Sequence, residues 1–319
     1  MHIITKPEII EILNKNQFED RLIKGFISYS KKEAVIPPVG ELLFKNPPGD
    51  VHIKYGYIIN EKYYVVKIAS GFPKNNEMGL TNSQGIMLLF SQKSGKIESI
   101  LLDDGYLTDI RTAIAGRICA KQFSNNIKSI GIIGNGLQAR LQLIYLLDCT
   151  SCRDVMIWGR NIEHLKRFKK SIEQLGFNTK ISPSISRLSD VCNLIIMTTS
   201  SDKPLLLKEH LKPGMHITAL GADTKSKREL GPGVLSYADL IIADSIEQCK
   251  MRGEIFHSLN EGDISIKDIV ELGNVLDKTS LGRKHENDIT IADLTGVAVQ
   301  DVSIASKIFE LYLKKRNEI

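Results

Sequence analysis

Long hydrophobic runs and a strong excess of charge of either sign are both absent from this chain of 319 residues. None of its apolar stretches approaches the roughly 18 residues that a membrane-spanning helix needs. Residues 1–7 contain neither an apolar core nor a small-residue cleavage site, so we read no secretory signal and expect a cytoplasmic protein. The net charge of +5 comes from 42 basic and 37 acidic residues. The basic clusters lack interleaved aromatics, which disfavours nucleic-acid binding.

Cysteine is also sparse, with five residues scattered along the chain, which favours reduced thiols over a disulfide framework. Cys149 and Cys152 form a C-x-x-C motif, but it ends an apolar run instead of opening a helix after a strand, so we interpret it as structural. No second Cys or His pair at zinc spacing accompanies it, and none of the seven histidines shows metal-ligand spacing. We therefore expect no metal site.

Two strand patterns divide the chain near residue 110. Before this point, apolar runs are paired across short turns, 55–59 with 63–68 and 85–90 with 97–102, which predicts an antiparallel sheet. After it, short apolar runs alternate with helical periodicity, which is typical of a doubly wound α/β fold whose parallel sheet is covered on both faces. The strands predicted there are 129–133, 154–158, 193–197, 216–220, 238–243 and 289–294.

A glycine-rich turn follows the first of these strands, at Gly134-x-Gly136-x-x-Ala139. In a dinucleotide-binding turn the first glycine makes the tight bend and the second lets the backbone approach the pyrophosphate. The third, small residue packs the helix on the strand, and the helix N-terminus stabilises the phosphates. The spacing therefore predicts a bound nicotinamide dinucleotide, with Leu137 and Gln138 in the same cofactor-binding turn.

The end of the next strand bears on which cofactor is bound. A site for NAD has an acidic residue there for the ribose hydroxyl, whereas a site for NADP has an arginine for the 2′-phosphate. Here the strand ends at Trp158-Gly159-Arg160, and no acid follows until Glu163. This pattern favours NADP(H), with NAD(H) as the alternative and a solvated loop as the structural interpretation of Arg160.

Several motifs together resemble the ornithine cyclodeaminase/mu-crystallin family, in the family's order from about residue 51 to 305. They are Lys67 with Gly71-Phe72-Pro73, Leu107-Thr108-Asp109 with Arg111-Thr112-Ala113, the glycine turn, Gly221-Ala222-Asp223 with Lys227-Arg228-Glu229-Leu230, and Asp293-Leu294-Thr295-Gly296-Val297-Ala298 with Gln300-Asp301. The resemblance implies a homodimer. It also implies a discontinuous substrate-binding and dimerisation domain, 1–115 with 297–319, and a Rossmann domain over 116–296.

The resemblance further implies hydride exchange between a nicotinamide and the α-carbon of an amino or imino acid. By position, Asp223 is similar to the family's acid/base. Lys67 and Arg111 are similar to its substrate-carboxylate ligands, and we count Lys67 with the catalytic residues as well. The cofactor-binding residues expected outside the glycine turn and Arg160 are Thr81, Arg111, Thr199, Lys227 and Val297.

The residues themselves leave alternatives open for this site. Asp223 follows an apolar strand, where a carboxyl group could protonate a substrate nitrogen, but an Asp in that place is also a common helix N-cap. Lys67 interrupts an apolar strand and either lies on a solvated sheet face or points into a site. Arg111 is either a structural ion-pair partner or a bidentate ligand of a substrate carboxylate.

Two departures from the family pattern bear on the substrate. The loop 36–41 lacks the Arg typical of ornithine cyclodeaminases, and Lys54 stands where a Glu is expected. A lysine there disfavours a substrate with a second amino group and makes Lys54 a candidate carboxylate ligand. We therefore predict an NADPH-dependent reductase of small cyclic ketimines of the pyrroline-2-carboxylate type. The alternatives are an NAD-dependent ornithine cyclodeaminase and a non-catalytic, NADPH-binding protein like mu-crystallin.

Overall fold

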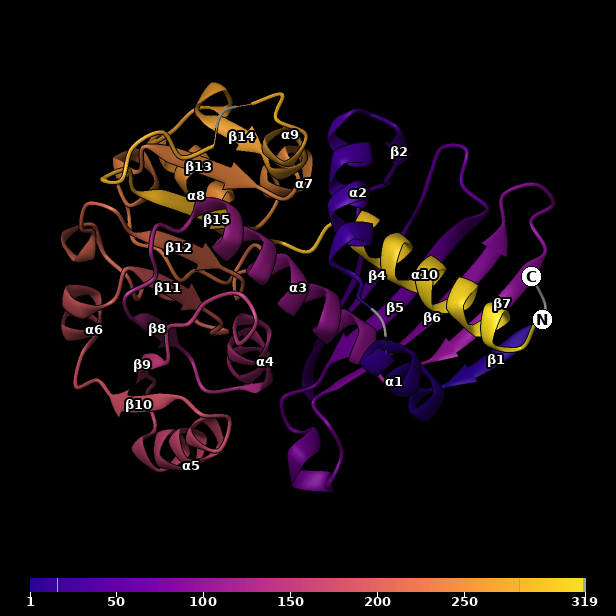
Figure 1. Cartoon of the computed structure of the whole chain (residues 1–319), viewed down its shortest axis with the longest axis horizontal. Helices are drawn as coiled ribbons and strands as arrows, with labels where there is room; N and C mark the ends of the chain where they lie inside the picture. The colour runs from indigo at the N-terminus through magenta and orange to yellow at the C-terminus, as the bar shows by residue number, and fades with distance from the viewer. Residues whose placement is uncertain (16, 281, 318–319) are drawn as a thin grey trace. The chain divides into compact units, whose positions relative to one another are not determined.

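The computed structural model describes residues 1–15, 17–280 and 282–317. The chain forms two compact units (Figure 1). The first unit is Met1–Arg111 with Val297–Ile319, and the second unit is Thr112–Gly296. Each unit is built around its own β-sheet, and the boundary between them falls after Arg111, within helix α3 (Tyr106–Phe123).

Among the described residues, the first unit has a seven-stranded sheet in the order β1-β7-β6-β5-β4-β2, with β3 paired to β4. Strands β4 to β7 run antiparallel, as the paired apolar runs predict, and β1 joins β7 in parallel. The strands are β1 (His2–Thr5), β2 (Ala34–Val35), β3 (Gly40–Lys45), β4 (Pro48–Ile58), β5 (Tyr63–Gly71), β6 (Ser83–Ser91) and β7 (Ile97–Leu102). Its helices are α1 (Lys6–Lys15), α2 (Glu19–Ser30), the short 3₁₀ helix η1 (Asn75–Met78) and α10 (Val299–Lys315).

One face of this sheet is covered by helices. Because side chains alternate along a strand, Val65 and Lys67 of β5 and Met87 and Leu89 of β6 point to the same face, and all four are buried. Helix α10 packs against α2 and across β4, β5 and β6 on that face. The C-terminal helix thus covers strands from the first third of the chain.

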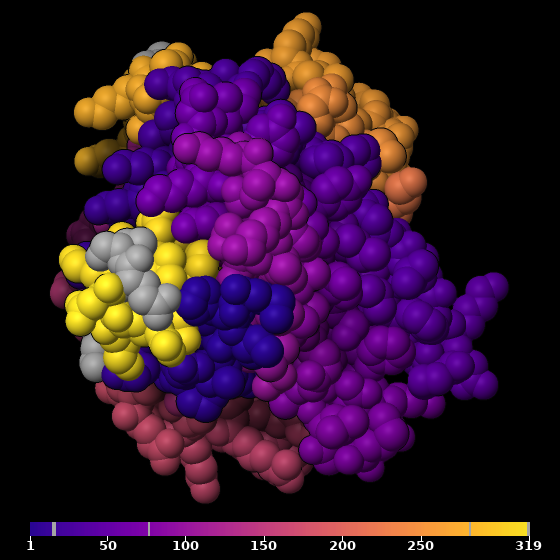
Figure 2. All heavy atoms as spheres, turned by 90° about the vertical axis from the view of Figure 1, so that its right-hand side faces the viewer, coloured from indigo at the N-terminus to yellow at the C-terminus, as the bar shows by residue number. Residues whose placement is uncertain are grey.

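The two ends of the chain lie side by side in the first unit, where Figure 2 shows the last residues of α10 against the first residues. The ring of His2 lies 5.6 Å from that of Phe309 and 5.7 Å from that of Tyr312. Nearby, Lys315 Nζ donates to Glu11 Oε2 at 2.7 Å. These contacts fasten α10 to the N-terminal elements.

In the described part of the second unit, eight parallel strands form a sheet in the order β10-β9-β8-β11-β12-β15-β13-β14. Its strands are β8 (Ile130–Ile133), β9 (Asp154–Trp158), β10 (Asn178–Ile181), β11 (Leu194–Met197), β12 (His216–Ala219), β13 (Leu240–Ala243), β14 (Ile269–Glu271) and β15 (Thr290–Asp293). Its other helices are α4 (Leu137–Leu146), α5 (Ile162–Glu173), α6 (Ile185–Val191), α7 (Ile246–Cys249), α8 (Gly253–Glu261) and α9 (Leu272–Leu276), with the 3₁₀ helices η2 (Lys208–His210), η3 (Leu235–Tyr237) and η4 (Ile266–Asp268).

Both faces of the parallel sheet are buried, which explains its continuous apolar strands. Ile130 and Ile132 of β8 belong to the hydrophobic core on one face, and Ile133 belongs to the core on the other. In β11, Ile196 belongs to the first of these cores and Ile195 belongs to the second. The prediction of a doubly wound sheet beside an antiparallel one is confirmed.

The sequence analysis did not predict two strands of the parallel sheet. Strand β10, Asn178–Ile181, lies at the sheet edge and is largely polar, and β14, Ile269–Glu271, has three residues. Neither carries a run of apolar residues long enough to predict a strand. No helix in the described part of the chain is long and apolar enough to cross a membrane.

Candidate functional site

The glycine turn of the second unit fits a dinucleotide. Gly134 has a φ of 124°, and a Cβ placed there would lie 2.4 Å from Thr198 Oγ1, so only glycine fits this bend. Gly136 is the N-cap of α4, and a Cβ on it would meet no atom within 4 Å, so the space before the helix N-terminus is open. Ala139 is fully buried in the core next to β8. These are the features that a pyrophosphate-binding turn needs.

A pocket of about 220 Å³ opens at this turn. Its lining combines the turn with the residues that follow β9 and β11, and so brings together Gly134, Gly136, Arg160 and Thr199 from the expected cofactor-binding set. Arg160 is exposed, and the residue after it, Asn161, caps α5 by accepting from the backbone N–H groups of Glu163 and His164. The end of β9 therefore offers the pocket a guanidinium and no carboxylate.

The other expected cofactor-binding residues have different surroundings. Leu137, the first residue of α4, is 54% exposed, and Gln138 beside it is half-buried. Thr81 lies in an exposed turn of the first unit and accepts at Oγ1 from Gln84 Nε2 at 2.7 Å. Val297 also belongs to the first unit and is fully buried. Neither Thr81 nor Val297 is among the residues that line the pocket at the glycine turn.

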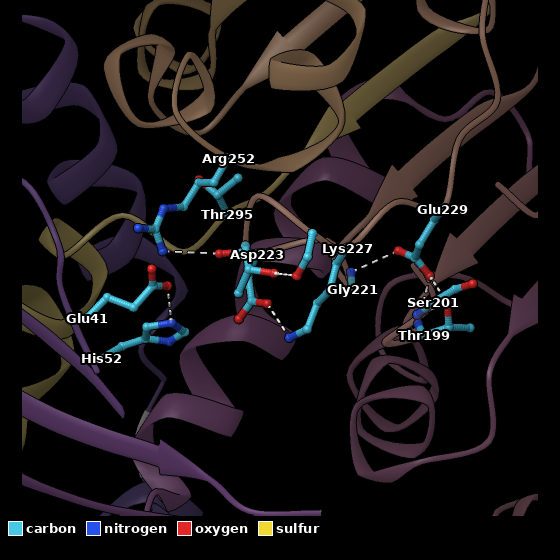
Figure 3. Close-up of polar contacts among 12 residues, drawn as sticks. Glu41, His52, Thr199, Ser201, Gly221, Asp223, Lys227, Glu229, Arg252 and Thr295 are labelled. Atoms are coloured by element: carbon cyan, nitrogen blue, oxygen red, sulfur yellow. Dashed lines mark hydrogen bonds and ion pairs between the residues drawn. The ribbon is translucent and has the colours of Figure 1, made fainter. Parts of the chain in front are cut away.

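Asp223 lies in the loop after β12, close to a lysine from the same loop. Lys227 Nζ donates to Asp223 Oδ1 at 2.6 Å, and both side chains are half-buried (Figure 3). Arg252 Nη1 donates to the backbone oxygen of Asp223 at 3.2 Å. Residues 220–239, all of which the structure describes, contain no helix other than the 3₁₀ helix η3. Asp223 is therefore not the N-cap of a helix, and its carboxylate faces an ammonium group instead.

A buried charge cluster lies in the first unit, between the sheet and α10. Lys67 Nζ lies 3.0 Å and 2.9 Å from the two carboxylate oxygens of Asp301, and Arg111 Nε lies 3.2 Å from Oδ1. Arg111 Nη1 also donates to Gln300 Oε1 at 3.4 Å. Lys67 is 2% exposed, so it does not lie on a solvated sheet face. Arg111 forms an ion pair with Asp301, which is one of the two roles that the sequence left open for it.

Lys54 adds a third cation to this cluster. It is 5% exposed and stands directly opposite Lys67 in the register of β4 and β5. Like charges directly opposite each other on a sheet are destabilising, and buried cations are costly without counter-charge. Lys67, Arg111 and Lys54 all act on the carboxylate of Asp301, so this part of the first unit is rich in cations.

The ionisation of the cluster follows from its burial and its charges. Burial lowers the pKa of Lys67 to about 8, although the carboxylate of Asp301 partly opposes this. Burial alone would raise the pKa of Asp301, but the three cations hold it below its usual value. Burial also raises the pKa of Asp103, which accepts from the backbone N–H of Leu107 at 2.8 Å. At neutral pH the cluster holds a charged Lys67 and an ionised Asp301.

Asp301 and Gln300 are the residues to which the sequence analysis gave no role. Both appear in the motifs of the family resemblance, but nothing in the local pattern of α10 links them to Lys67, which is 234 positions away from Asp301. The available signal was an acid in the first turn of the last helix. Among the described residues, no group of three or more His, Cys, Asp or Glu side chains is arranged to hold a metal ion.

Known proteins share this architecture over nearly their whole length. The family model for the ornithine cyclodeaminase/mu-crystallin family matches residues 2–316. An uncharacterized cyclodeaminase of Sinorhizobium fredii is 38% identical, over 97% of this chain and 95% of its own. A Δ1-pyrroline-2-carboxylate reductase of Bacillus cereus is 25% identical, over 99% and 98%.

Solved structures give the same result. An archaeal alanine dehydrogenase dimer with bound NAD has a TM-score of 0.90 at 30% identity, covering 98% of this chain and 96% of its own. The iminosuccinate reductase of Paracoccus denitrificans in complex with NAD+ has a TM-score of 0.87 at 28% identity, over 99% and 97%. Because the family model matches almost the whole chain, this chain belongs to the ornithine cyclodeaminase/mu-crystallin family.

Proposed function

We propose that the protein is an NADPH-dependent reductase of small α-imino acids, most directly cyclic ketimines such as pyrroline-2-carboxylate. The observation that carries this proposal is the cluster of Lys54, Lys67 and Arg111 around Asp301. A buried site that holds a lysine and an arginine side by side suits the carboxylate of an α-imino acid. It does not suit a second amino group on the substrate.

The residues have separate roles in the proposed reaction. In the first unit, Lys67 and Arg111, with Lys54, bind the substrate carboxylate. In the second unit, the glycine turn holds the dinucleotide, whose nicotinamide supplies hydride to the α-carbon when it is bound. Reduction of C=N also needs a proton on nitrogen, and Asp223 in its protonated form donates it as a general acid. Lys227, bonded to Asp223, holds that carboxyl group in place and stabilises the carboxylate left after proton transfer.

We further propose a preference for NADPH over NADH, because the pocket offers Arg160 and no acid at the end of β9. The two related structures cited above hold NAD, so this preference rests on Arg160 alone.

We also propose that the protein is a homodimer that pairs through the outer face of the first unit's sheet. Tyr55, Ile68 and Leu102, each next in sequence to a buried inward-facing residue, are about two-fifths exposed there. The rings of Tyr64 and Phe90 stack on each other at 4.8 Å. A sheet face this apolar is typical of a buried interface. Light scattering should give twice the mass of the chain, and Ile68→Glu should give the single-chain mass.

A dicarboxylic α-imino acid is the second candidate substrate, and the position of Lys54 opposite Lys67 favours it. One carboxylate would lie with Lys67 and Arg111, and the other would lie with Lys54. Lys54→Met should then weaken binding of the dicarboxylic substrate by about 10-fold or more and that of the monocarboxylic one much less.

Nicotinamide absorbance tests the proposal. Purified protein is mixed with NADPH or NADH and with pyrroline-2-carboxylate, or with oxaloacetate plus ammonium as a source of the dicarboxylic imine. Oxidation of NADPH with pyrroline-2-carboxylate is the expected result, and faster oxidation with the second mixture would select the dicarboxylic candidate. Ammonia released from ornithine with catalytic NAD would overturn the reductase in favour of a cyclodeaminase. Cofactor binding without any turnover would show a non-catalytic protein.

A further inference from the structure

We propose that Glu229 is a positioning residue, whose carboxylate ties together two strand ends of the second unit and so fixes the loop that carries Asp223 and Lys227. The geometry is independent of the substrate, although the catalytic consequence rests on the proposed function. Glu229 is the acid of the Lys227-Arg228-Glu229-Leu230 motif and has no part in the mechanism above.

The carboxylate of Glu229 is fully buried and accepts three hydrogen bonds (Figure 3). Oε1 accepts from the backbone N–H of Thr199 and from its Oγ1, both at 2.7 Å. Oε2 accepts from the backbone N–H of Gly221 at 2.9 Å. Thr199 follows β11 and Gly221 follows β12, so one side chain bridges the carboxyl ends of two neighbouring parallel strands. Two of the three donors are backbone N–H groups, and they bond to different oxygens of the carboxylate. An amide side chain has only one oxygen, so it could accept from only one of these two N–H groups in the same arrangement.

Gly221 shows how closely these two strand ends approach. A Cβ on Gly221 would lie 2.0 Å from the backbone oxygen of Thr199 and 2.7 Å from Glu229 Oε2. No other residue type fits there without moving the backbone of Thr199. The loop therefore starts from a fixed point two residues before Asp223, and Thr199 at that point also lines the cofactor pocket.

The far end of the loop is fixed through the backbone of Glu229. Its N–H donates to Glu254 Oε1 at 2.7 Å, and the N–H of Leu230 donates to Glu254 Oε2 at 2.9 Å. The carbonyl oxygen of Glu229 accepts from the backbone N–H groups of Leu205 and Leu206. Residues 221 and 229 are thus both anchored, and the residues between them carry Asp223 and Lys227.

The burial of Glu229 and the charges around it make its hydrogen bonds with Thr199 and Gly221 sensitive to protonation. Burial raises the pKa of Glu229 to about 7, against the bonds from Thr199 and Gly221 and the charge of Lys227. The acids that face it are Glu254 of α8 and Asp293 of β15, and burial raises the pKa of both. A protonated Glu229 presents an O–H where a backbone N–H needs an acceptor. The three hydrogen bonds that the Glu229 carboxylate accepts are therefore all present above about pH 7 and weaken below it.

Hydrogen exchange of the amides in residues 221–228 tests the proposal without substrate or cofactor. In Glu229→Gln, one acceptor oxygen becomes an N–H₂ donor that faces a backbone N–H. We expect these amides to exchange about 10-fold faster or more than in the unchanged protein, while β8 and β11 keep their protection. After correction for intrinsic rates, the unchanged protein should show faster exchange of this loop at pH 6 than at pH 8, and Glu229→Gln should show no such difference.

Glu261→Gln is the matched control, because Glu261 also bonds to this loop, through Arg228, but lies nearer the surface. Its exchange in residues 221–228 should stay within about twofold of the unchanged protein. If Glu229→Gln does not fold, Thr199→Val, which removes a single donor, should still raise exchange in this loop alone.

Unchanged exchange in Glu229→Gln, or in Thr199→Val where that variant is needed, would overturn the proposal. An increase spread evenly over the second unit would overturn it as well. Where an imino acid is turned over, Glu229→Gln should lower kcat about 10-fold and change KM for that substrate less than about threefold. If no imino acid is turned over at all, the proposed function fails while the exchange result still decides the role of Glu229.

Discussion

Lys67 and Asp301 lie 234 positions apart in the sequence, yet Lys67 Nζ lies 2.9 Å from Asp301 Oδ2 in the interior of the first unit. The pair joins a strand from the N-terminal part of the chain to the first turn of its last helix. Arg111 shares the same carboxylate, so one anion neutralises two buried cations. The stability of the first unit and its affinity for a carboxylate ligand should therefore both depend on Asp301.

Replacing Asp301 with Asn should lower the free energy of unfolding by about 3 kcal/mol or more, because Arg111 would keep its charge in the interior without its anion and Lys67 would lose the carboxylate that opposes the lowering of its pKa. Denaturant unfolding measures this loss. Glu310→Gln in the same helix is the control, since Glu310 is only partly buried and its loss should cost less than about 0.5 kcal/mol. Equal stability of Asp301→Asn and the unchanged protein would show that the cluster is solvated in solution.

The pH dependence of catalysis should report Lys67. With its pKa lowered to about 8 by burial, Lys67 is charged below that pH and attracts a carboxylate, and it becomes neutral above it. We expect kcat/KM for the imino acid to fall as the pH rises through about 8, because kcat/KM follows the ionisation of the free enzyme.

Lys67→Arg separates this effect from titration of the substrate, since a guanidinium stays charged throughout the range. The ratio of kcat/KM in the unchanged protein to that in Lys67→Arg should therefore decline above pH 8. A ratio that stays constant from pH 7 to pH 10 would mean that Lys67 does not titrate there.

Asp223→Asn should remove the proton donor and leave the cofactor site intact. We expect kcat to fall by about 100-fold or more, while the dissociation constant for NADPH changes less than about threefold. Cofactor fluorescence gives the second value. Asp202→Asn, at an exposed acid of the same unit, is the matched control and should keep full activity. Full turnover by Asp223→Asn would remove Asp223 from the acid/base role.

Arg160→Ser should weaken NADPH binding by about 10- to 100-fold, as expected for one lost charge-assisted contact to a phosphate. NADH affinity should change little, because NADH has no 2′-phosphate. Arg187→Ser removes another exposed arginine of the same unit, from α6, and should alter neither affinity. Equal weakening of both cofactors by Arg160→Ser would place Arg160 near a group that they share.

Local patterns in the sequence were enough to predict the two sheets, the glycine turn and the loop after β12. Alternation and apolar runs depend on neighbouring residues, so they predicted strands such as β5 and β8. They missed β10 and β14, whose pairing comes from the adjacent strand and not from their own composition. The bend at Gly134 could also be predicted, because it depends on the backbone conformation of that one glycine.

The sequence by itself determined which residue types stand at the ends of strands: glycines after β8, an arginine after β9 and an aspartate after β12. Only the tertiary structure decided that Lys67 is buried, because α10 covers its face of the sheet. The same holds for Asp223, which lies beside Lys227 and caps no helix. The burial of Lys67 and its pairing with Asp301 bring together residues from distant parts of the chain, and no local pattern encodes them.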